Sequence, residues 1–261
     1  AALAGINIAG TDTLTVSDTG ANIQALTTGD IDDLDAATGA VVFDASDNAY
    51  TLTAAQASAV DGISLATGDT VTVGDADIGA ISSGDITTLA AQAASVVFND
   101  SNDAYTLTAA QAAEVGDISL IAGDTVTVSD GDIGTLTSTQ IANLASKAAT
   151  VVFDDTGGNA YTFTAAQAAA VGDISLITGD TVTIADTGAN LAASLTAAVL
   201  ATLVGTDAAA VIKSSDNTLC LTVAQVAAIT GNLTLTGADI VSILDTGANM
   251  AAMSAGTISG L

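Results

Sequence analysis

Short apolar runs with polar residues between them recur along the whole chain. The run Thr70-Val71-Thr72-Val73 is typical, because its apolar side chains occupy every second position. Such alternation, together with the many β-branched residues, predicts a strand with one buried face. The pattern predicts first strands at 6–8, 41–43, 63–65, 96–98, 118–120, 151–153, 174–176, 211–212 and 233–235, and second strands at 14–16, 50–52, 71–73, 105–107, 126–128, 161–163, 182–184, 219–221 and 240–243.

Alanine-rich segments after the second strands carry helix start and stop signals. A Thr-x-x-Gln capping box, in which each partner binds the other's backbone N–H, opens four of them. The boxes are Thr53/Gln56, Thr108/Gln111, Thr164/Gln167 and Thr222/Gln225. Left-handed glycines are expected to end these helices, at Gly62, Gly116, Gly172 and Gly231. Such short helices are stable only when packed against a sheet.

A second set of helices is expected after the sequence Asp-Thr-Gly-Ala-Asn, with Asp18, Asp186 and Asp245 as N-caps. The longest helical text is 185–211. There Leu191, Leu195, Val199 and Leu203 recur every four residues, which predicts one buried stripe.

The same text returns at a fixed interval. The triplet Val-Val-Phe begins at Val41, Val96 and Val151, a period of 55 residues, and each period divides into parts of about 22 and 33 residues with the same order of elements. Such repetition indicates stacked supersecondary units. We therefore expect a mixed β/α repeat solenoid of about nine coils with short parallel strands and short helical turns. An all-β parallel β-helix is the alternative. Residues 1–261 are expected to form a single elongated solenoid that is a fragment or processed part of a longer repeat protein.

The charge balance narrows the range of partners. The chain has two basic residues against 29 acidic ones, a net charge of −27, and no His. Nucleic acids and anionic membranes bind through Lys and Arg, so neither is expected as a partner, whereas divalent cations are. No apolar run approaches the roughly 18 residues that cross a bilayer, which argues against direct membrane insertion. Cys220 is the single cysteine, and it is expected to be a small, buried or half-buried thiol.

The segments SDTGANIQAL, ADTGANLAASL, YTLTAAQ and GNLTLTGADI together carry a family resemblance. They resemble the tandem β-strand-repeat modules of very large secreted bacterial cell-surface proteins, which are S-layer-like or adhesin-like. The likeness covers essentially residues 10–250. It implies export and a structural or adhesive role at the cell surface. The chain lacks the Gly-Gly-x-Gly-x-Asp calcium nonapeptide found in such proteins, so no calcium site follows from the resemblance.

Catalysis has little support in the composition. With no His, no Arg and one Cys, triad and arginine-clamp chemistry are excluded. Paired carboxylates can hydrolyse glycosides, but three Tyr and no Trp offer few platforms for a sugar. We expect no enzyme activity.

Acidic turns between the strands are the best candidate metal site. If the coils stack, their carboxylates gather along one edge, and Ca²⁺ would relieve the repulsion with oxygen ligands. The alternative is that Asp and Asn only form turns there, with Na⁺ and water screening the charge. The candidates are Asp44, Asp47, Asp69, Asp100, Asp103, Asp124, Asp154, Asp155 and Asp180.

The sequence as a whole predicts a non-enzymatic structural protein that associates with itself. Uncapped coil ends favour a surface layer, filament or adhesin stalk, because exposed strand edges accept further strands. Thr-x-Thr pairs such as Thr70/Thr72 leave an alternative, an ice- or glycan-binding module that uses a Thr-rich face.

Overall fold

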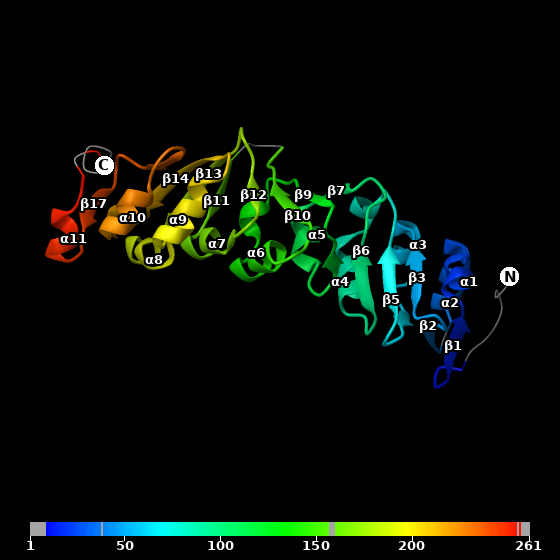
Figure 1. Cartoon of the computed structure of the whole chain (residues 1–261). Coiled ribbons are helices and arrows are strands. Elements are labelled where there is room, and N and C mark those ends of the chain that lie inside the picture. The colour runs from blue at the N-terminus through cyan, green and yellow to red at the C-terminus, as the bar shows by residue number, and fades with distance from the viewer. Residues whose placement is uncertain (1–8, 38, 157–159, 255, 257–261) are drawn as a thin grey trace. The chain divides into compact units, whose positions relative to one another are not determined.

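The computed structural model describes residues 9–37, 39–156, 160–254 and 256. Its contacts divide the chain into two compact units, Ala1–Thr127 with Lys147–Thr150, and Val128–Ser146 with Val151–Leu261. Both units combine short parallel strands with short helices (Figure 1). The predicted mixed α/β class is therefore confirmed. The all-β alternative is wrong, because the alanine-rich segments form α-helices.

In the first unit, strands and helices alternate along the chain. The strands are β1 (Thr13–Asp18), β2 (Ala40–Ala45), β3 (Ala49–Leu52), β4 (Ile63–Leu65), β5 (Thr70–Val73), β6 (Ser95–Phe98), β7 (Ala104–Leu107), β8 (Ser119–Leu120) and β9 (Thr125–Val128), whose last residue belongs to the second unit. The helices are α1 (Gly20–Gln24), α2 (Thr28–Asp35), α3 (Ala54–Ala59), the 3-10 helix η1 (Ile78–Ala80), α4 (Ser83–Ala90) and α5 (Ala109–Glu114).

The second unit follows the same order of elements. Its strands are β10 (Thr150–Phe153, from Val151 on), β11 (Ala160–Phe163), β12 (Ser175–Leu176), β13 (Thr181–Asp186), β14 (Ala209–Ser214), β15 (Thr218–Leu221), β16 (Leu233–Leu235) and β17 (Ile240–Ile243). Its helices are η2 (Ile133–Thr135), α6 (Ser138–Ala145), α7 (Ala165–Ala170), α8 (Gly188–Ser194), α9 (Ala197–Val204), α10 (Val223–Ala228) and α11 (Gly247–Ala251). All predicted strands except the one at 6–8, which lies outside the described residues, are present.

Strands pair in parallel within each unit, as predicted. The first unit has the orders β1-β2-β4 and β3-β5-β6-β8, and the second has β11-β13-β14-β16 and β15-β17. The register places Tyr50 beside Val71 and Val71 beside Val96. A second strand of one repeat part therefore lies next to a first strand of the following part.

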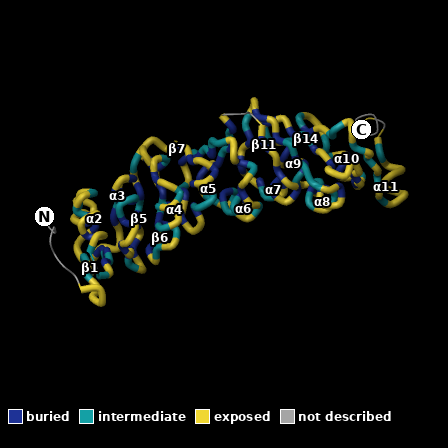
Figure 2. Tube along the Cα trace, turned by 180° about the vertical axis from the view of Figure 1, so that it is seen from behind, coloured by how far each residue is buried: buried dark blue, intermediate teal, exposed yellow. Residues whose placement is uncertain are grey.

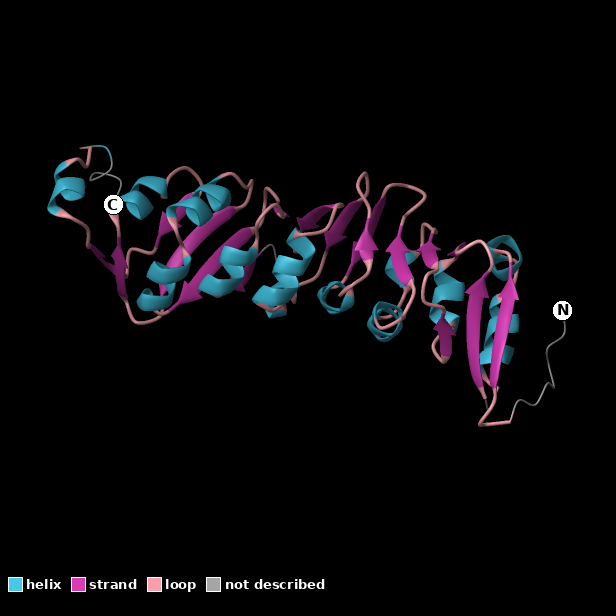
Figure 3. Ribbon diagram, turned by 60° about the horizontal axis from the view of Figure 1, so that its bottom comes forward, coloured by secondary structure: helices cyan, strands magenta, loops and turns pink. Residues whose placement is uncertain are grey.

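The core consists of the apolar side chains that alternate along these strands. Val71 and Val73 are fully buried, as are the four phenylalanines, Phe43, Phe98, Phe153 and Phe163. Figure 2 shows buried positions alternating with exposed turns along the trace of each unit. Helices pack against the strands in each unit, for example α1 against β3 and α8 against β15 (Figure 3), and successive helices such as α4 and α5 are in contact.

All four predicted capping boxes form, each with both reciprocal hydrogen bonds. Gly116, Gly172 and Gly231 take positive φ as predicted. Gly62 does not, and that prediction is wrong. The equivalent residues of two repeats are in opposite order here, Asp61-Gly62 in one and Gly116-Asp117 in the other. Gly62 therefore aligns with Asp117, one position after the place of Gly116. A Cβ at position 62 would meet the carboxylate of Asp35, an exposed side chain that can rotate away.

The Asp-Thr-Gly-Ala-Asn helices begin one residue later than predicted. Their N-caps are the threonines, Thr19, Thr187 and Thr246. Around α8, Thr187 Oγ1 accepts from the backbone N–H of Asn190 at 3.3 Å. Asp186 Oδ1 accepts from the Thr187 N–H at 2.8 Å and from Asn190 Nδ2 at 2.7 Å. The aspartate thus binds the N-cap's own N–H, which is the role of the last residue in a capping box.

The text at 185–211 forms two helices, α8 and α9. Leu191, Leu195 and Leu203 are buried as predicted, but Val199 departs from the stripe. Thr196 caps the second helix through the Val199 N–H at 3.3 Å, and this new start resets the helical phase. Leu200 is buried in place of Val199, which is half-buried.

Cys220 is exposed, contrary to prediction. It lies on β15 between Leu219 and Leu221, whose side chains are buried. Because side chains of a strand alternate between its faces, Cys220 must point outward.

The glutamines of the four predicted capping boxes also make a contact that the sequence pattern does not reveal. The side chains of Gln56, Gln111, Gln167 and Gln225 are buried. In Gln111, Oε1 accepts from the Thr108 N–H at 2.7 Å, and Nε2 donates to the carbonyl oxygens of Gly79 and Ile81 at 2.9 and 2.6 Å. The other three glutamines reach two earlier carbonyl groups in the same way. One amide therefore starts its own helix and ties it to the preceding loop.

Candidate functional site

The nine candidate aspartates fall into two groups. Asp47 and Asp103 are exposed, and Asp44 and Asp154 are half-buried. The other five are at most 3% exposed, which is rare for a carboxylate without a partner. They are Asp69, Asp100, Asp124, Asp155 and Asp180.

Three of the buried carboxylates hold the turn that follows a first strand. Asp69 Oδ2 accepts from the Ala45 N–H at 2.9 Å, and Asp180 Oδ2 accepts from the Asp155 N–H at 3.0 Å. Asp124 Oδ2 accepts from the Asp100 N–H at 3.2 Å. The structure therefore brings each of these aspartates to the turn of the preceding repeat part. A charged acceptor for a buried backbone N–H stabilises that turn.

Burial has an electrostatic cost at these positions. Desolvation raises the pKa of Asp124, the charges of Asp103 and Asp100 add to the shift, and the Asp100 N–H opposes it. Desolvation likewise raises the pKa of Asp180, with Asp154 and Asp155 adding to it. These carboxylates are thus harder to keep ionised than exposed ones.

The exposed aspartates serve the geometry of the turns. Asp47 Oδ1 accepts from the Gly20 N–H at 2.7 Å. Asp103 has φ of +59°, and Asn48 and Asn217 have +58° and +56° at the corresponding position of other repeats. Asp and Asn tolerate this left-handed conformation better than other non-glycine residues, so the turn-forming interpretation accounts for these positions.

No group of three or more acidic, cysteine or histidine side chains is arranged to hold a metal within the described residues. The aspartates meet in small sets, one for each turn. Binding of Ca²⁺ along this edge stays a prediction.

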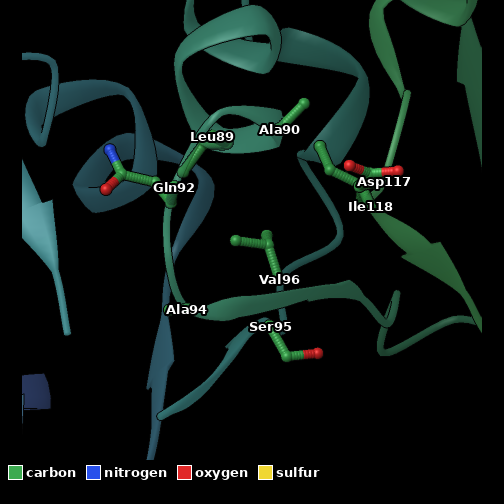
Figure 4. A pocket seen from close by; sticks show the side chains of 8 residues that line it. All are labelled: Leu89, Ala90, Gln92, Ala94, Ser95, Val96, Asp117 and Ile118. Atoms are coloured by element: carbon green, nitrogen blue, oxygen red, sulfur yellow. The ribbon is translucent and has the colours of Figure 1, made fainter. Parts of the chain in front are cut away.

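A pocket lies beside α4 in the first unit (Figure 4). Its walls include the apolar side chains of Leu89, Val96 and Ile118, and Asp117 is its one carboxylate. Gln92 uses its amide on β4, accepting from the Leu65 N–H at 2.9 Å and donating to the Ile63 carbonyl oxygen at 3.2 Å. A single carboxylate among alkyl groups does not supply the acid and base that glycoside hydrolysis needs.

The threonine pairs lie on the outer face of the sheets. Thr51 and Thr72 are neighbours on β3 and β5, and both are half-buried. The same row continues with Val97 and Ser119 on β6 and β8. The row is therefore free of charge, but only its first two members are threonines.

No described helix has both the length and the apolar character needed to cross a membrane. Comparisons with protein families, with curated proteins and with solved structures found no match.

Proposed function

We propose that this chain is a non-enzymatic structural protein of the bacterial cell exterior, which builds a surface layer, filament or adhesin stalk. In this proposal the repeat parts form about nine coils of one elongated solenoid, and association occurs coil on coil. The location outside the cell rests on the resemblance to secreted surface repeats. The mode of association rests on the strand edges described next.

The edge of β17 is the observation that carries the proposal. Within the described residues β17 pairs only with β15, whereas the corresponding strand β13 has β11 and β14 on its two sides. Ile240 and Leu244 are 69% and 71% exposed, and Met250 is 46% exposed. Exposed apolar edges of this kind favour addition of a further strand.

The β1 edge offers a second surface of the same type. Its described pairing is with β2 alone, and its apolar residues Leu14 and Val16 are only half-buried. In the second unit the corresponding residues Val182 and Ile184, between two neighbouring strands, are fully buried. A partner strand on β1 would bury Leu14 and Val16 in the same manner.

The test blocks one edge while leaving the fold intact. The N–H of Ile240 donates to the Asn217 carbonyl oxygen just before β15, and the N–H of Leu244 donates to the Leu221 carbonyl oxygen on β15. By alternation, the N–H of Val241 points to the free edge. Val241→Pro removes that donor without breaking the ladder to β15. We expect the native chain to assemble with rising concentration in sedimentation velocity and electron microscopy, and Val241→Pro to remain monomeric.

The control variant is Ala193→Lys, which changes an exposed residue away from the edge. Proline is not used at this position, because it would break α8. The Ala193→Lys variant should assemble like the native chain. If the native chain stays monomeric at high concentration, with and without millimolar Ca²⁺, the proposed assembly is wrong.

A second candidate function is ice or glycan binding by the outer sheet face. The observation in its favour is the charge-free row that begins with Thr51 and Thr72 and continues with Val97 and Ser119. A thermal-hysteresis assay tests the ice-binding form. Activity that Thr72→Lys abolishes would support it, and no activity at high concentration would exclude it.

A further inference from the structure

Two carboxylates are buried side by side at the turn between β6 and β7. Asp100 and Asp124 are each 1% exposed. Asp124 Oδ2 accepts from the Asp100 backbone N–H at 3.2 Å, and Asp100 Oδ1 accepts from the Asn102 N–H at 2.7 Å. One oxygen of each carboxylate is therefore engaged by the backbone.

Two further oxygen atoms at this turn are buried without a hydrogen bond inside the described chain. They are Asp100 Oδ2 and the hydroxyl oxygen of Tyr105, a residue 6% exposed. The hydroxyl groups of Tyr50 and Tyr161 are buried without a partner in the same way, so Asp100 Oδ2 is the atom that distinguishes this turn from the other two. Burial raises the pKa of Tyr105, and the charges of Asp124 and Asp100 add to it, so both carboxylates act on this hydroxyl. Each buried polar group without a partner costs free energy, because it has lost its hydrogen bonds to water. A ligand that binds oxygen atoms would remove this cost.

The negative charge of Asp100 and Asp124 indicates which kind of ligand would bind. Two buried carboxylates repel each other, and a cation offsets both charges at once. The available donors are all oxygen atoms, which hard cations prefer, and Ca²⁺ takes about 6–8 of them with flexible geometry. The two carboxylates would supply part of such a shell, and water would have to supply the rest.

We propose that Asp100 and Asp124, with the Tyr105 hydroxyl beside them, form a buried Ca²⁺ site in the first unit. It differs from the predicted acidic edge, because the exposed Asp103 and Asp47 take no part. It is also independent of the proposed assembly, since all three residues belong to one unit of one chain.

The other repeats provide natural comparisons. Position 100 corresponds to Ala45 in the first repeat and to Ser214 in the last. Both residues keep the N–H bond to the next aspartate, Ala45 to Asp69 at 2.9 Å and Ser214 to Asp239 at 2.8 Å. The turn thus forms without a second carboxylate, and these two repeats should not bind Ca²⁺ in this way.

The repeat at Asp155 and Asp180 has both carboxylates, together with Tyr161. There Asp155 Oδ2 accepts from the Ala160 N–H at 3.1 Å. Because this oxygen already has a donor, we expect the Asp155 repeat to bind Ca²⁺ more weakly than the Asp100 repeat.

The experiment uses Tb³⁺, which replaces Ca²⁺ and luminesces when a nearby tyrosine absorbs light. In a Tyr50→Phe/Tyr161→Phe chain, Tyr105 is the one remaining tyrosine of the three in the sequence. We expect saturable tyrosine-sensitised emission that added Ca²⁺ displaces. Asp100→Ala should weaken binding at least about tenfold, and circular dichroism should show a retained fold, as Ala45 predicts.

Asp103→Asn is the matched control. It removes one charge from the same turn, and asparagine is natural there, as Asn48 and Asn217 show. It should retain the saturable emission. Absence of sensitised emission would overturn the proposal, as would emission that Asp103→Asn abolishes and Asp100→Ala leaves intact. Calorimetry that detects no Ca²⁺ binding to the native chain would also overturn it.

Discussion

The side-chain amide of Gln111 donates a 2.6 Å hydrogen bond to the backbone carbonyl oxygen of Ile81, thirty residues earlier in the chain. The same nitrogen donates to the Gly79 carbonyl oxygen, while Oε1 completes the capping box of α5. The capping box alone would accept glutamate. Only an amide provides both the acceptor for the cap and the donor for the loop.

Gln111→Glu should therefore destabilise the first unit although it preserves the box. The variant places a carboxylate against two carbonyl oxygens and removes both donors, and we expect a loss of about 1–3 kcal/mol. Urea unfolding followed by circular dichroism measures it. Gln24→Glu, the same change at an exposed position, should have little effect. Equal unfolding midpoints for the two variants would show that the link between helix and loop contributes nothing.

The second prediction concerns Gly188, the first residue of α8. A Cβ there would overlap the carbonyl oxygen of Thr218 on β15, so the helix start approaches that strand more closely than any side chain allows. Gly188→Ala should destabilise the second unit by about 1–3 kcal/mol through overpacking. Gly29→Ala is the control within a helix, because the nearest atom to its Cβ would be Thr27 Oγ1 at 3.9 Å.

Gly29→Ala should stabilise α2 by about 0.4–1 kcal/mol, because alanine restricts the unfolded chain and meets no clash in the folded one. Thermal unfolding of the two variants thus gives shifts of opposite sign. Shifts of the same sign would contradict the close approach at Gly188.

Local periodicity was sufficient for the positions of the strands and of the four capping boxes, because both depend on residues within one turn or strand. Contacts between distant segments were not accessible in this way. The roles of the Gln111 amide and of the Asp124 carboxylate depend on partners in other repeat parts. The buried face of α9 was also not fully predicted, because it depends on Thr196 starting a new helix at that point.

The candidate site shows the same division. Turn-forming propensity correctly indicates Asp and Asn at 48, 103 and 217, where φ is positive. Composition does not distinguish the exposed Asp103 from the buried Asp124, because both are aspartates of an acidic turn. Only the strand register, which brings Asp124 under the Asp100 N–H, separates them.

The third prediction follows from the low pKa of Asp216. Its hydrogen bond from Ser214 Oγ, then those from the N–H groups of Gly188 and Thr218, lower the pKa from 3.8 to about 2. A carboxylate whose pKa is lower in the folded state stabilises that state above the unfolded pKa. The contribution is lost as pH falls through the folded pKa.

Asp216→Asn should therefore be less stable than the native chain above pH 3.8, and the difference should shrink as pH falls toward about 2. Urea midpoints of the two proteins across this range measure the difference, and comparing them cancels the titration of the other carboxylates. A difference that is constant with pH would assign the role of Asp216 to shape and hydrogen bonding rather than to its charge.

The final prediction concerns Lys147, whose ammonium group donates to the carbonyl oxygens of Gly116 and Ile118 at 2.7 and 2.9 Å. Gln92 occupies the same repeat position and donates to the Ile63 carbonyl oxygen. The position thus requires a donor rather than a positive charge.

Lys147→Gln should change the free energy of unfolding by less than about 0.5 kcal/mol. Lys147→Leu, which keeps the apolar stem and removes the donor, should cost about 0.5–1.5 kcal/mol for each hydrogen bond lost. Chemical denaturation distinguishes the two. A Gln variant as unstable as the Leu variant would mean that the charge itself, beside Asp117, stabilises this turn.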